Sequence, residues 1–388
     1  MDTKKILEIF NQAMEFKKNG DLISAEKNYK EILSMTTVLP EVYYNLALVY
    51  ARMFRFHEAI DNMKIYLKSE PDDIEGRYFL STYYFMLRDF DKGLELFESR
   101  VSKTHAIMTE AKTYGNLYSD IPFWSGEDLT DKVIFVYYEA GLGDTLMYFR
   151  YLKELSKVCK KVYFKPQISL LSLFAENRGD VKIIMHVKES ISKECDYQCP
   201  IMSIPYLLGL NNKNIFVHTD KFLHASKKKK EYYKQKYFNN DLLKICVKWQ
   251  GNTLIGGERA ITAKSFEKIF TLANTQIYSV QVNEGQEQLN ELSCKHNIID
   301  LGSTFKDFSD TAGAIANADI VICNDTSVAH LAGAMGVKTY VILPENYDWR
   351  WHDDISKCYW YNSIKLYQKQ TTWEDVVDKI YNDILVNL

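Results

Sequence analysis

Two hydroxyl residues and a histidine follow an apolar, β-branched run at residues 319–323. This run predicts a strand that is buried on both faces of a parallel sheet, and Thr326 or Ser327 would then begin a helix containing His330. The amide groups at such a helix N-terminus attract an anion, because their N–H bonds point out of the helix. We therefore predict a diphosphate site here. The alternative is an ordinary βαβ unit in which the hydroxyls only cap the helix.

Asp144 lies in a second turn that leads from a predicted strand into a predicted helix. Residues 133–138 predict a strand, Gly141 and Gly143 permit a tight turn with its backbone close to a ligand, and Asp144 lies where the next helix begins. Asp144 is either a cap for that helix or a general base that takes a proton from an acceptor hydroxyl. The turn lacks the third glycine of the dinucleotide fingerprint, so we do not predict a dinucleotide site.

Further candidates lie in two loops that follow predicted strands in the C-terminal half. Asn252 and Arg259 follow the strand at residues 245–249 and could donate hydrogen bonds to phosphate oxygens, unless this glycine-rich segment is only a surface loop. Gln281 ends the strand at residues 277–281, and Glu284 just beyond it could bind a ribose hydroxyl. Strands and helical segments alternate here, which predicts a doubly wound parallel sheet whose loops converge on one crevice.

The first hundred residues show a different pattern, with a period of 34 residues. Small residues recur at this spacing, in the series Ala13, Ala47, Ser81 and Ala25, Ala59, Gly93. Gly20 precedes the second helix of the first repeat, and we place Phe54 and Asp89 at the equivalent positions. The pattern resembles three tetratricopeptide repeats over residues 5–102, which typically hold a peptide or protein on a concave face. The alternative is that they dock on the next domain or dimerise.

Length and charge narrow the classes of function. A chain of 388 residues predicts two or three domains, and a formal charge of −3 gives no field that would attract nucleic acid or an anionic membrane. The lysine run at 227–230 is interpreted as a solvated linker. No apolar run approaches the ~18 residues of a membrane span, and no secretion signal opens the sequence, so we expect a cytoplasmic protein with no membrane span. The seven scattered cysteines are expected to be reduced.

Residues 124–376 resemble the glycosyltransferases of the heptosyltransferase superfamily (family 9-like), in the version fused behind tetratricopeptide repeats. The resemblance rests on segments in a fixed order, which are EAGLGDTLMYFRYL, VKWQGN, ERAIT, IYSVQ, IIDLG, DFSDTAGAIANADIVICNDTSVAHLAGAMG, LPENYDWRW and TTWEDVV. It implies a GT-B fold, with two Rossmann-like doubly wound domains behind the α-helical repeats. The expected domains are residues 1–105 for the repeats, 106–225 for the acceptor domain and 226–388 for the nucleotide-sugar domain.

The same resemblance implies a role for each matching residue. Asp144 would be the general base and Arg259 would reach the diphosphate, while Asp325 would orient its loop. Ala260 departs from the family pattern, which commonly has serine after the arginine, and alanine supplies no hydroxyl at this position. The full set of expected nucleotide-sugar contacts is Gly143, Asn252, Arg259, Gln281, Glu284, Asp325, Thr326, Ser327 and His330.

The predicted function is an inverting glycosyltransferase that moves a sugar from a nucleotide-sugar donor to an acceptor hydroxyl. Neither a cofactor nor a metal ion is expected, because Arg259 and the helix N-terminus would stabilise the leaving diphosphate. The repeats suggest a protein acceptor, with lipopolysaccharide or another glycan as the alternative. A different class of function is a repeat-based scaffold that carries an inactive transferase module.

Overall fold

The computed structural model describes residues 3–101, 121–183, 193–252 and 257–386, which form two compact units. The helical unit consists of residues 3–101 together with Asn211–Ile215 and Asp348–Asp354. The α/β unit consists of the described residues in 121–210, 216–347 and 355–386. Within the described chain, no helix combines the length and the apolar character that a membrane crossing needs.

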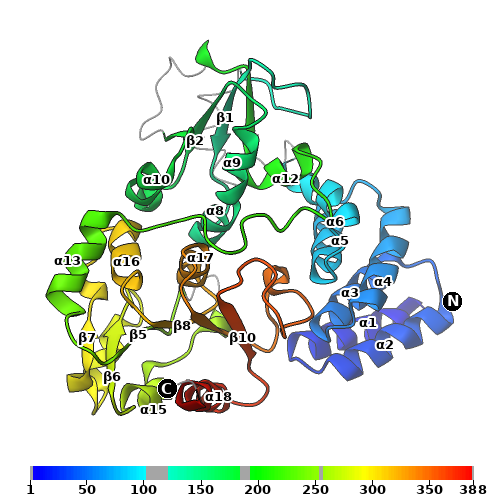
Figure 1. The fold of residues 1–388 in the computed structure, drawn as a ribbon. Helices are drawn as coiled ribbons and strands as arrows, with labels where there is room; N and C mark the ends of the chain where they lie inside the picture. The colour runs from blue at the N-terminus through cyan, green and yellow to red at the C-terminus, as the bar shows by residue number, and fades with distance from the viewer. Residues whose placement is uncertain (1–2, 102–120, 184–192, 253–256, 387–388) are drawn as a thin grey trace. The chain divides into compact units, whose positions relative to one another are not determined.

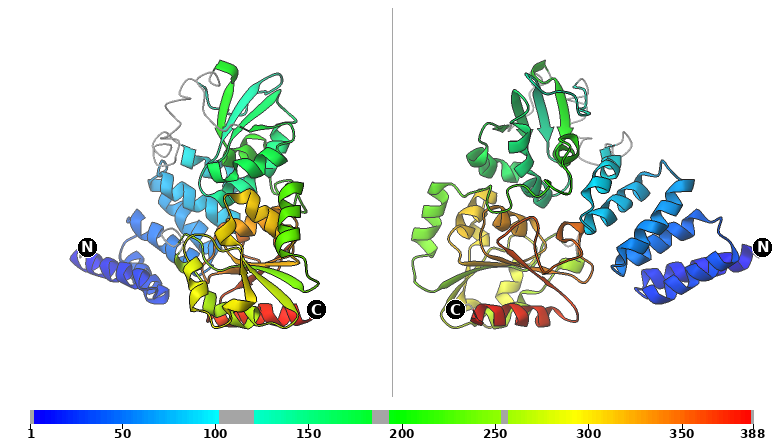
Figure 2. Two further views of the ribbon diagram at one scale, coloured as in Figure 1. Left: turned by 90° about the vertical axis from the view of Figure 1, so that its left-hand side faces the viewer. Right: turned by 45° about the vertical axis from the view of Figure 1, so that its right-hand side comes forward.

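The helical unit contains three helical hairpins within residues 3–101, stacked in sequence order (Figure 2). Their helices are α1 (Thr3–Lys18), α2 (Leu22–Met35), α3 (Pro40–Arg52), α4 (Phe56–Ser69), α5 (Ile74–Met86) and α6 (Phe90–Phe97). The recurring small residues are buried, and a Cβ added at Gly93 would lie 2.5 Å from the Phe85 ring. This contact explains why glycine replaces alanine in the third hairpin. The hairpins and their period are present, while their identity as tetratricopeptide repeats stays a prediction.

The turns inside the three hairpins share one backbone conformation. Gly20, Phe54 and Arg88, spaced 34 residues apart, have φ angles of 84°, 57° and 59°. The third equivalent of Gly20 is therefore Arg88, and our placement of Asp89 there was wrong by one residue. Asp89 instead caps α6, because its Oδ1 accepts a hydrogen bond from Lys92 N at 3.3 Å. A left-handed conformation costs non-glycine residues about 1 kcal/mol or more, so the stacked hairpins must hold this turn in place.

Two distant segments complete the third hairpin. Asn212 Oδ1 accepts hydrogen bonds from the amide groups of Phe90 and Asp91 at the start of α6. Segment Asp348–Asp354, which includes the 3₁₀ helix η9 (Trp349–Trp351), packs against α5. His352 is buried there, with Nδ1 2.8 Å from the Phe85 carbonyl oxygen. A division of the chain at residue 105 leaves out both segments, because their contacts span more than 120 residues of sequence.

The α/β unit begins with a four-stranded parallel sheet in the order β3-β2-β1-β4. Its strands are β1 (Val133–Tyr137), β2 (Lys161–Lys165), β3 (Lys182–Ile183) and β4 (Tyr197–Pro200). Its helices are α8 (Leu142–Tyr148), α9 (Arg150–Leu155), α10 (Leu171–Asn177) and α12 (Ile204–Leu207). Because β1 is buried between two neighbours, its carboxyl end delivers the glycine turn and α8 to the edge of the sheet.

The second sheet of the α/β unit has six parallel strands in the order β10-β9-β8-β5-β6-β7 (Figure 1). They are β5 (Leu243–Lys248), β6 (Thr275–Ser279), β7 (Ile298–Asp300), β8 (Ile320–Asn324), β9 (Thr339–Leu343) and β10 (Ile364–Gln368). The helices are α13 (Lys227–Tyr237), α15 (Glu267–Phe270), α16 (Phe308–Ile315), α17 (Ser327–Ala334) and α18 (Trp373–Val386). The strand order reverses between β5 and β8, and such a point opens a ligand crevice at the carboxyl ends of the strands.

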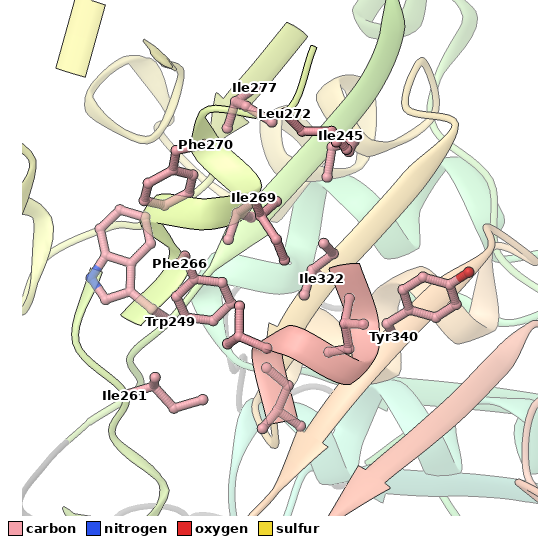
Figure 3. Close-up of a cluster of buried hydrophobic side chains, with 14 of the residues drawn as sticks. Ile245, Trp249, Ile261, Phe266, Ile269, Phe270, Leu272, Ile277, Ile322 and Tyr340 are labelled. Atoms are coloured by element: carbon pink, nitrogen blue, oxygen red, sulfur yellow. The ribbon is translucent and has the colours of Figure 1, made fainter. Parts of the chain in front are cut away.

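The two faces of this sheet are covered differently. On one face Ile245 and Val247 of β5 and Trp249 just after it pack in a large apolar cluster with α15 and α18 (Figure 3). Side chains alternate along a strand, so Cys246 and Lys248 belong to the opposite face. That face carries α17, which contacts β8 and β9, and α16, which contacts α17 (Figure 1). The described parts of the chain thus form a mixed α/β protein with doubly wound parallel sheets, as the sequence predicts.

Candidate functional site

The N-terminus of α17 lies at the point where the strand order of the second sheet reverses. β8 ends at Asn324, and Thr326 is the N-cap residue of α17, with φ −143° and ψ 174°. The Thr326 side chain makes no capping hydrogen bond, and its hydroxyl lies 3.4 Å from the Asn324 carbonyl oxygen. Among the described residues, no side chain caps the first amide groups of this helix, so these groups can bind an anion.

The loop after β5 is fastened to this helix start. Arg259, in the short 3₁₀ helix η4 (Gly257–Arg259), places Nη1 3.2 Å from Asp325 Oδ2 and 3.4 Å from its carbonyl oxygen. Asn324 Nδ2 donates to the Arg259 carbonyl oxygen at 2.8 Å. A Cβ added at Gly251 would lie 2.9 Å from Thr326 Cγ2, so a larger residue there would push the loop away. Three contacts therefore bring Arg259 to the first turn of α17.

Arg259 keeps donors that can serve a ligand. Its side chain is 37% exposed, while that of Asp325 is 5% exposed. Among the described residues, only Nη1 of this guanidinium has an acceptor, although the group carries five N–H donors. Asp325 thus holds one edge of the guanidinium and leaves the remaining donors available.

The glycine turn after β1 meets α17 directly. A Cβ added at Gly143 would lie 2.9 Å from His330 Cδ2 and 3.6 Å from Ser327 Cα, so the backbones of α8 and α17 approach closely. Only glycine permits this approach without displacing the histidine ring. The contact brings together two turns that are more than 180 residues apart in the sequence and that both begin helices at the carboxyl ends of parallel strands.

Asp144 caps the N-terminus of α8 in this turn. It is the third residue of α8, and its Oδ2 accepts a hydrogen bond from the N-cap amide of Gly141 at 2.9 Å. The capping alternative is therefore present in the structure, although Asp144 lies at the third helical position and Gly141 is the N-cap. Asp144 is half-buried at the edge of the sheet.

His330 is buried and held by a residue that sequence reasoning missed. Its Nδ1 lies 3.0 Å from Tyr361 Oη, and the two rings meet edge to face with centroids 5.8 Å apart. Tyr361 also covers the backbone of α17, because a Cβ added at Gly333 would lie 2.5 Å from its ring. The aromatic run at residues 359–361 gave no signal for this contact, since its spacing matches no helix or strand face.

Gln281 lies inside the protein and fastens loops to each other. Its side chain is fully buried, and its Oε1 accepts hydrogen bonds from Trp249 N at 3.2 Å and Gln250 N at 3.0 Å. Its Nε2 donates to the carbonyl oxygens of Gln250 and Glu284. These bonds give Gln281 a positioning role between the loops after β5 and β6. Asn252 and Glu284 are both exposed.

Lys248 is a second residue that sequence reasoning missed. It ends β5, is only 5% exposed, and burial lowers the pKa of its amine from 10.5 to about 8. The signal was present in the sequence ICVKW, where a lysine stands on the inward face of a central strand. Because charged groups are rarely buried without a partner, a lysine at such a position indicates either a partner or a ligand.

No protein-family model matches this chain, and no curated protein matches its sequence. Among solved structures it is similar to a family 9 glycosyltransferase from Veillonella parvula, with 11% identity, a TM-score of 0.48, and coverage of 63% of this chain and 88% of that chain. It is also similar to the ADP-heptose lipopolysaccharide heptosyltransferase II of E. coli, with 10% identity, a TM-score of 0.48, and coverage of 65% and 97%.

A third similar structure corrects one expectation. The dodecameric glycosyltransferase TibC of enterotoxigenic E. coli, described as iron-containing, shares 11% identity at a TM-score of 0.42, with 64% of this chain and 67% of that chain covered. This finding overturns the expectation that no cofactor or metal takes part. The physical reason is that a guanidinium and a metal ion can both neutralise a leaving diphosphate, so Arg259 does not make a metal redundant.

Proposed function

We propose that this chain is a glycosyltransferase that binds the diphosphate of a nucleotide sugar at the N-terminus of α17. The observation that carries the proposal is the close approach at Gly143, which joins a carboxylate-bearing turn to an uncapped helix start. A sugar transferase needs these two features within one sugar's length of each other. One feature stabilises the leaving group, and the other accepts the proton of the attacking hydroxyl.

The leaving group is the nucleoside diphosphate, which gains negative charge as the bond to the sugar breaks. The amide groups of Ser327 and Val328 and the hydroxyls of Thr326 and Ser327 would donate to its phosphate oxygens. Arg259 would add a charged donor, held in orientation by the buried Asp325. These contacts strengthen as charge develops, so they favour the transition state more than the bound substrate.

Asp144 would act on the acceptor. The acceptor oxygen attacks the anomeric carbon from the face opposite the diphosphate, and the new C–O bond forms as the bond to the phosphate oxygen breaks. The proton of the acceptor hydroxyl passes to the Asp144 carboxylate, and the configuration at the anomeric carbon is inverted. Gly143 would keep this carboxylate close to the donor by letting α8 contact α17.

The remaining predicted contacts would surround the nucleoside. Asn252 and Glu284 are exposed on the loops after β5 and β6, where they can reach a ribose or phosphate that projects from the crevice. Gln281 would act indirectly by fixing these two loops to each other. His330 would contact the nucleotide sugar, and its hydrogen bond to Tyr361 would fix the orientation of its ring.

The acceptor is proposed to be a protein segment held by the helical unit, because stacked helical hairpins present an extended surface suited to peptides. A lipopolysaccharide or another glycan is the alternative acceptor. A scaffold with an inactive transferase module is a second candidate function. The capping bond of Asp144 favours it, because that bond would preserve the aspartate without catalysis.

Donor turnover in the presence of candidate acceptors, measured with a panel of nucleotide sugars, tests the proposal. Asn at position 144 can still accept the Gly141 amide bond, so Asp144→Asn removes the base and keeps the cap. We expect kcat to fall by about 10²-fold or more with an unchanged melting temperature. The matched control is Asp375→Asn, an exposed aspartate in the first turn of α18, which should leave kcat unchanged. Equal turnover of the Asp144 variant and the wild type would show that Asp144 is not the base, whereas a folded wild type that turns over none of the donors would favour the scaffold.

A further inference from the structure

Lys248 is a buried cation that a bound anion would stabilise. Its side chain is 5% exposed, and in the described part of the chain its amine has neither a hydrogen-bond acceptor nor an ion-pair partner. Burying an amine without a partner costs several kcal/mol when the group is charged, so such a residue is rare unless a ligand compensates it. Burial lowers its pKa from 10.5 to about 8, which leaves the amine largely protonated at pH 7.

The strand register places Lys248 beside the proposed diphosphate site. Lys248 pairs with Cys323 on β8, two residues before Asp325 and three before Thr326. Neighbouring strands lie about 4.8 Å apart, a distance that a lysine side chain spans. Its neighbours Val247 and Trp249 pack on the α15 and α18 face, so Lys248 belongs to the face that α17 covers. The amine therefore lies between the sheet and the layer that holds the α17 N-terminus.

The titratable groups around this face do not supply a counter-charge. Cys246 on β5 and Cys323 on β8 are fully buried, and burial raises the pKa of both thiols far above neutrality. Asp325, after β8, is engaged by Arg259, and Asp310 on α16 is engaged by Lys229 and Tyr233 of α13. On α17 the histidine is bonded to Tyr361. These carboxylates are committed to other partners.

We propose that Lys248 is a binding residue for the diphosphate of the donor and contacts it from the sheet side of the α17 N-terminus. This inference rests on the proposed function and names a residue that the sequence motif does not include. Arg259 would hold the diphosphate from the loop side, and Lys248 would hold it from beneath. Binding of the anion compensates the buried amine, so affinity depends on the protonation of Lys248.

Calorimetric titration of the full chain with ADP, GDP and UDP, between pH 6.5 and 9.5, tests this inference. The nucleotide that binds most tightly to the wild type is then used with every variant. We expect Lys248→Met to weaken binding by about tenfold or more at pH 7, since a charged hydrogen bond is lost. Wild-type affinity should fall above pH 8, because binding must then protonate the amine, and Lys248→Met should lack this dependence. Lys248→Arg should bind at pH 9.5 as it does at pH 7.

The matched control is Lys268→Met, which removes an exposed lysine of the same unit that pairs with Asp378. It should bind like the wild type at every pH. If Lys248→Met binds as tightly as the wild type with the same pH profile, the inference is wrong and the proposed function stands. If the folded wild type binds none of the three nucleotides, the proposed function fails, and this inference fails with it.

Discussion

Replacing Lys248 with methionine is expected to stabilise the α/β unit at neutral pH. The folded-state pKa of about 8 lies about 2.5 units below the ordinary value of 10.5. Each unit corresponds to 1.36 kcal/mol, so the buried charge costs about 3 kcal/mol. The side chain is 5% exposed, which leaves little solvent to screen it. Methionine has a similar length and no charge, so the free energy of unfolding of the variant should exceed that of the wild type by up to about 3 kcal/mol.

The stability gained by Lys248→Met should depend on pH. Between pH 8 and 10.5 the unfolded chain binds more protons at residue 248 than the folded chain does. The stability of the wild type should therefore rise with pH in this window relative to that of the variant. Below pH 8 the amine is charged in both states, and the penalty is fully present. The stability difference between the two proteins should shrink as the pH rises from 8 to 10.5.

The assay is urea denaturation at pH 7, 9 and 10, with hydrogen exchange of the β5 and β8 amides to report on the α/β unit alone. Lys268→Met is the control, because its amine is exposed and its loss should change stability by less than about 1 kcal/mol. A Lys248→Met protein that is less stable than the wild type at pH 7 would refute the reasoning. A stability difference that stays constant from pH 7 to 10 would refute it equally.

Three further predictions concern other positions. Gly302→Ala should lower the free energy of unfolding by about 3 kcal/mol or more or abolish folding, because the added Cβ would lie 1.7 Å from the Gln281 carbonyl oxygen. An unchanged urea midpoint would contradict this packing. Gly143→Ala should displace His330 and weaken nucleoside diphosphate binding several-fold while the chain stays folded, and wild-type affinity in titration would contradict it. Burial lowers the pKa of His352 from 6.5 to about 3, so the unfolded chain binds more protons than the folded chain between these pH values. The helical unit should therefore lose stability as the pH falls from 6.5 to 3. Helical circular dichroism at pH 5 and 7 should show that His352→Gln removes this acid sensitivity, and an unaltered acid response would contradict the prediction.

The elements with regular patterns could be predicted from sequence. The small residues at a period of 34 predict the hairpins, and the apolar runs predict β1, β5 and β8 close to their observed bounds. Strands β4 and β10 were not predicted. β4 has four residues and ends at Pro200, and β10 alternates apolar residues with the exposed Lys365 at the edge of the sheet. Short strands take their stability from their neighbours, which a single sequence does not reveal.

The candidate site could be predicted only in part for the same reason. Residues 325–330 and 141–144 are recognisable because helix starts and glycine turns have local signatures. The contact of Gly143 with His330, and that of His330 with Tyr361, depend on tertiary packing across distant elements. The buried role of Gln281 likewise follows from hydrogen bonds to two loops that sequence order does not place together.

The most direct test of the central claim is a crystal structure of the full chain with the nucleoside diphosphate that binds it most tightly. We expect phosphate oxygens within hydrogen-bond distance of the Ser327 and Val328 amides and the Arg259 guanidinium. Asp144 would lie on the side of the diphosphate where the sugar is attached. A nucleotide bound elsewhere, with the N-terminus of α17 unaltered by its presence, would contradict the account.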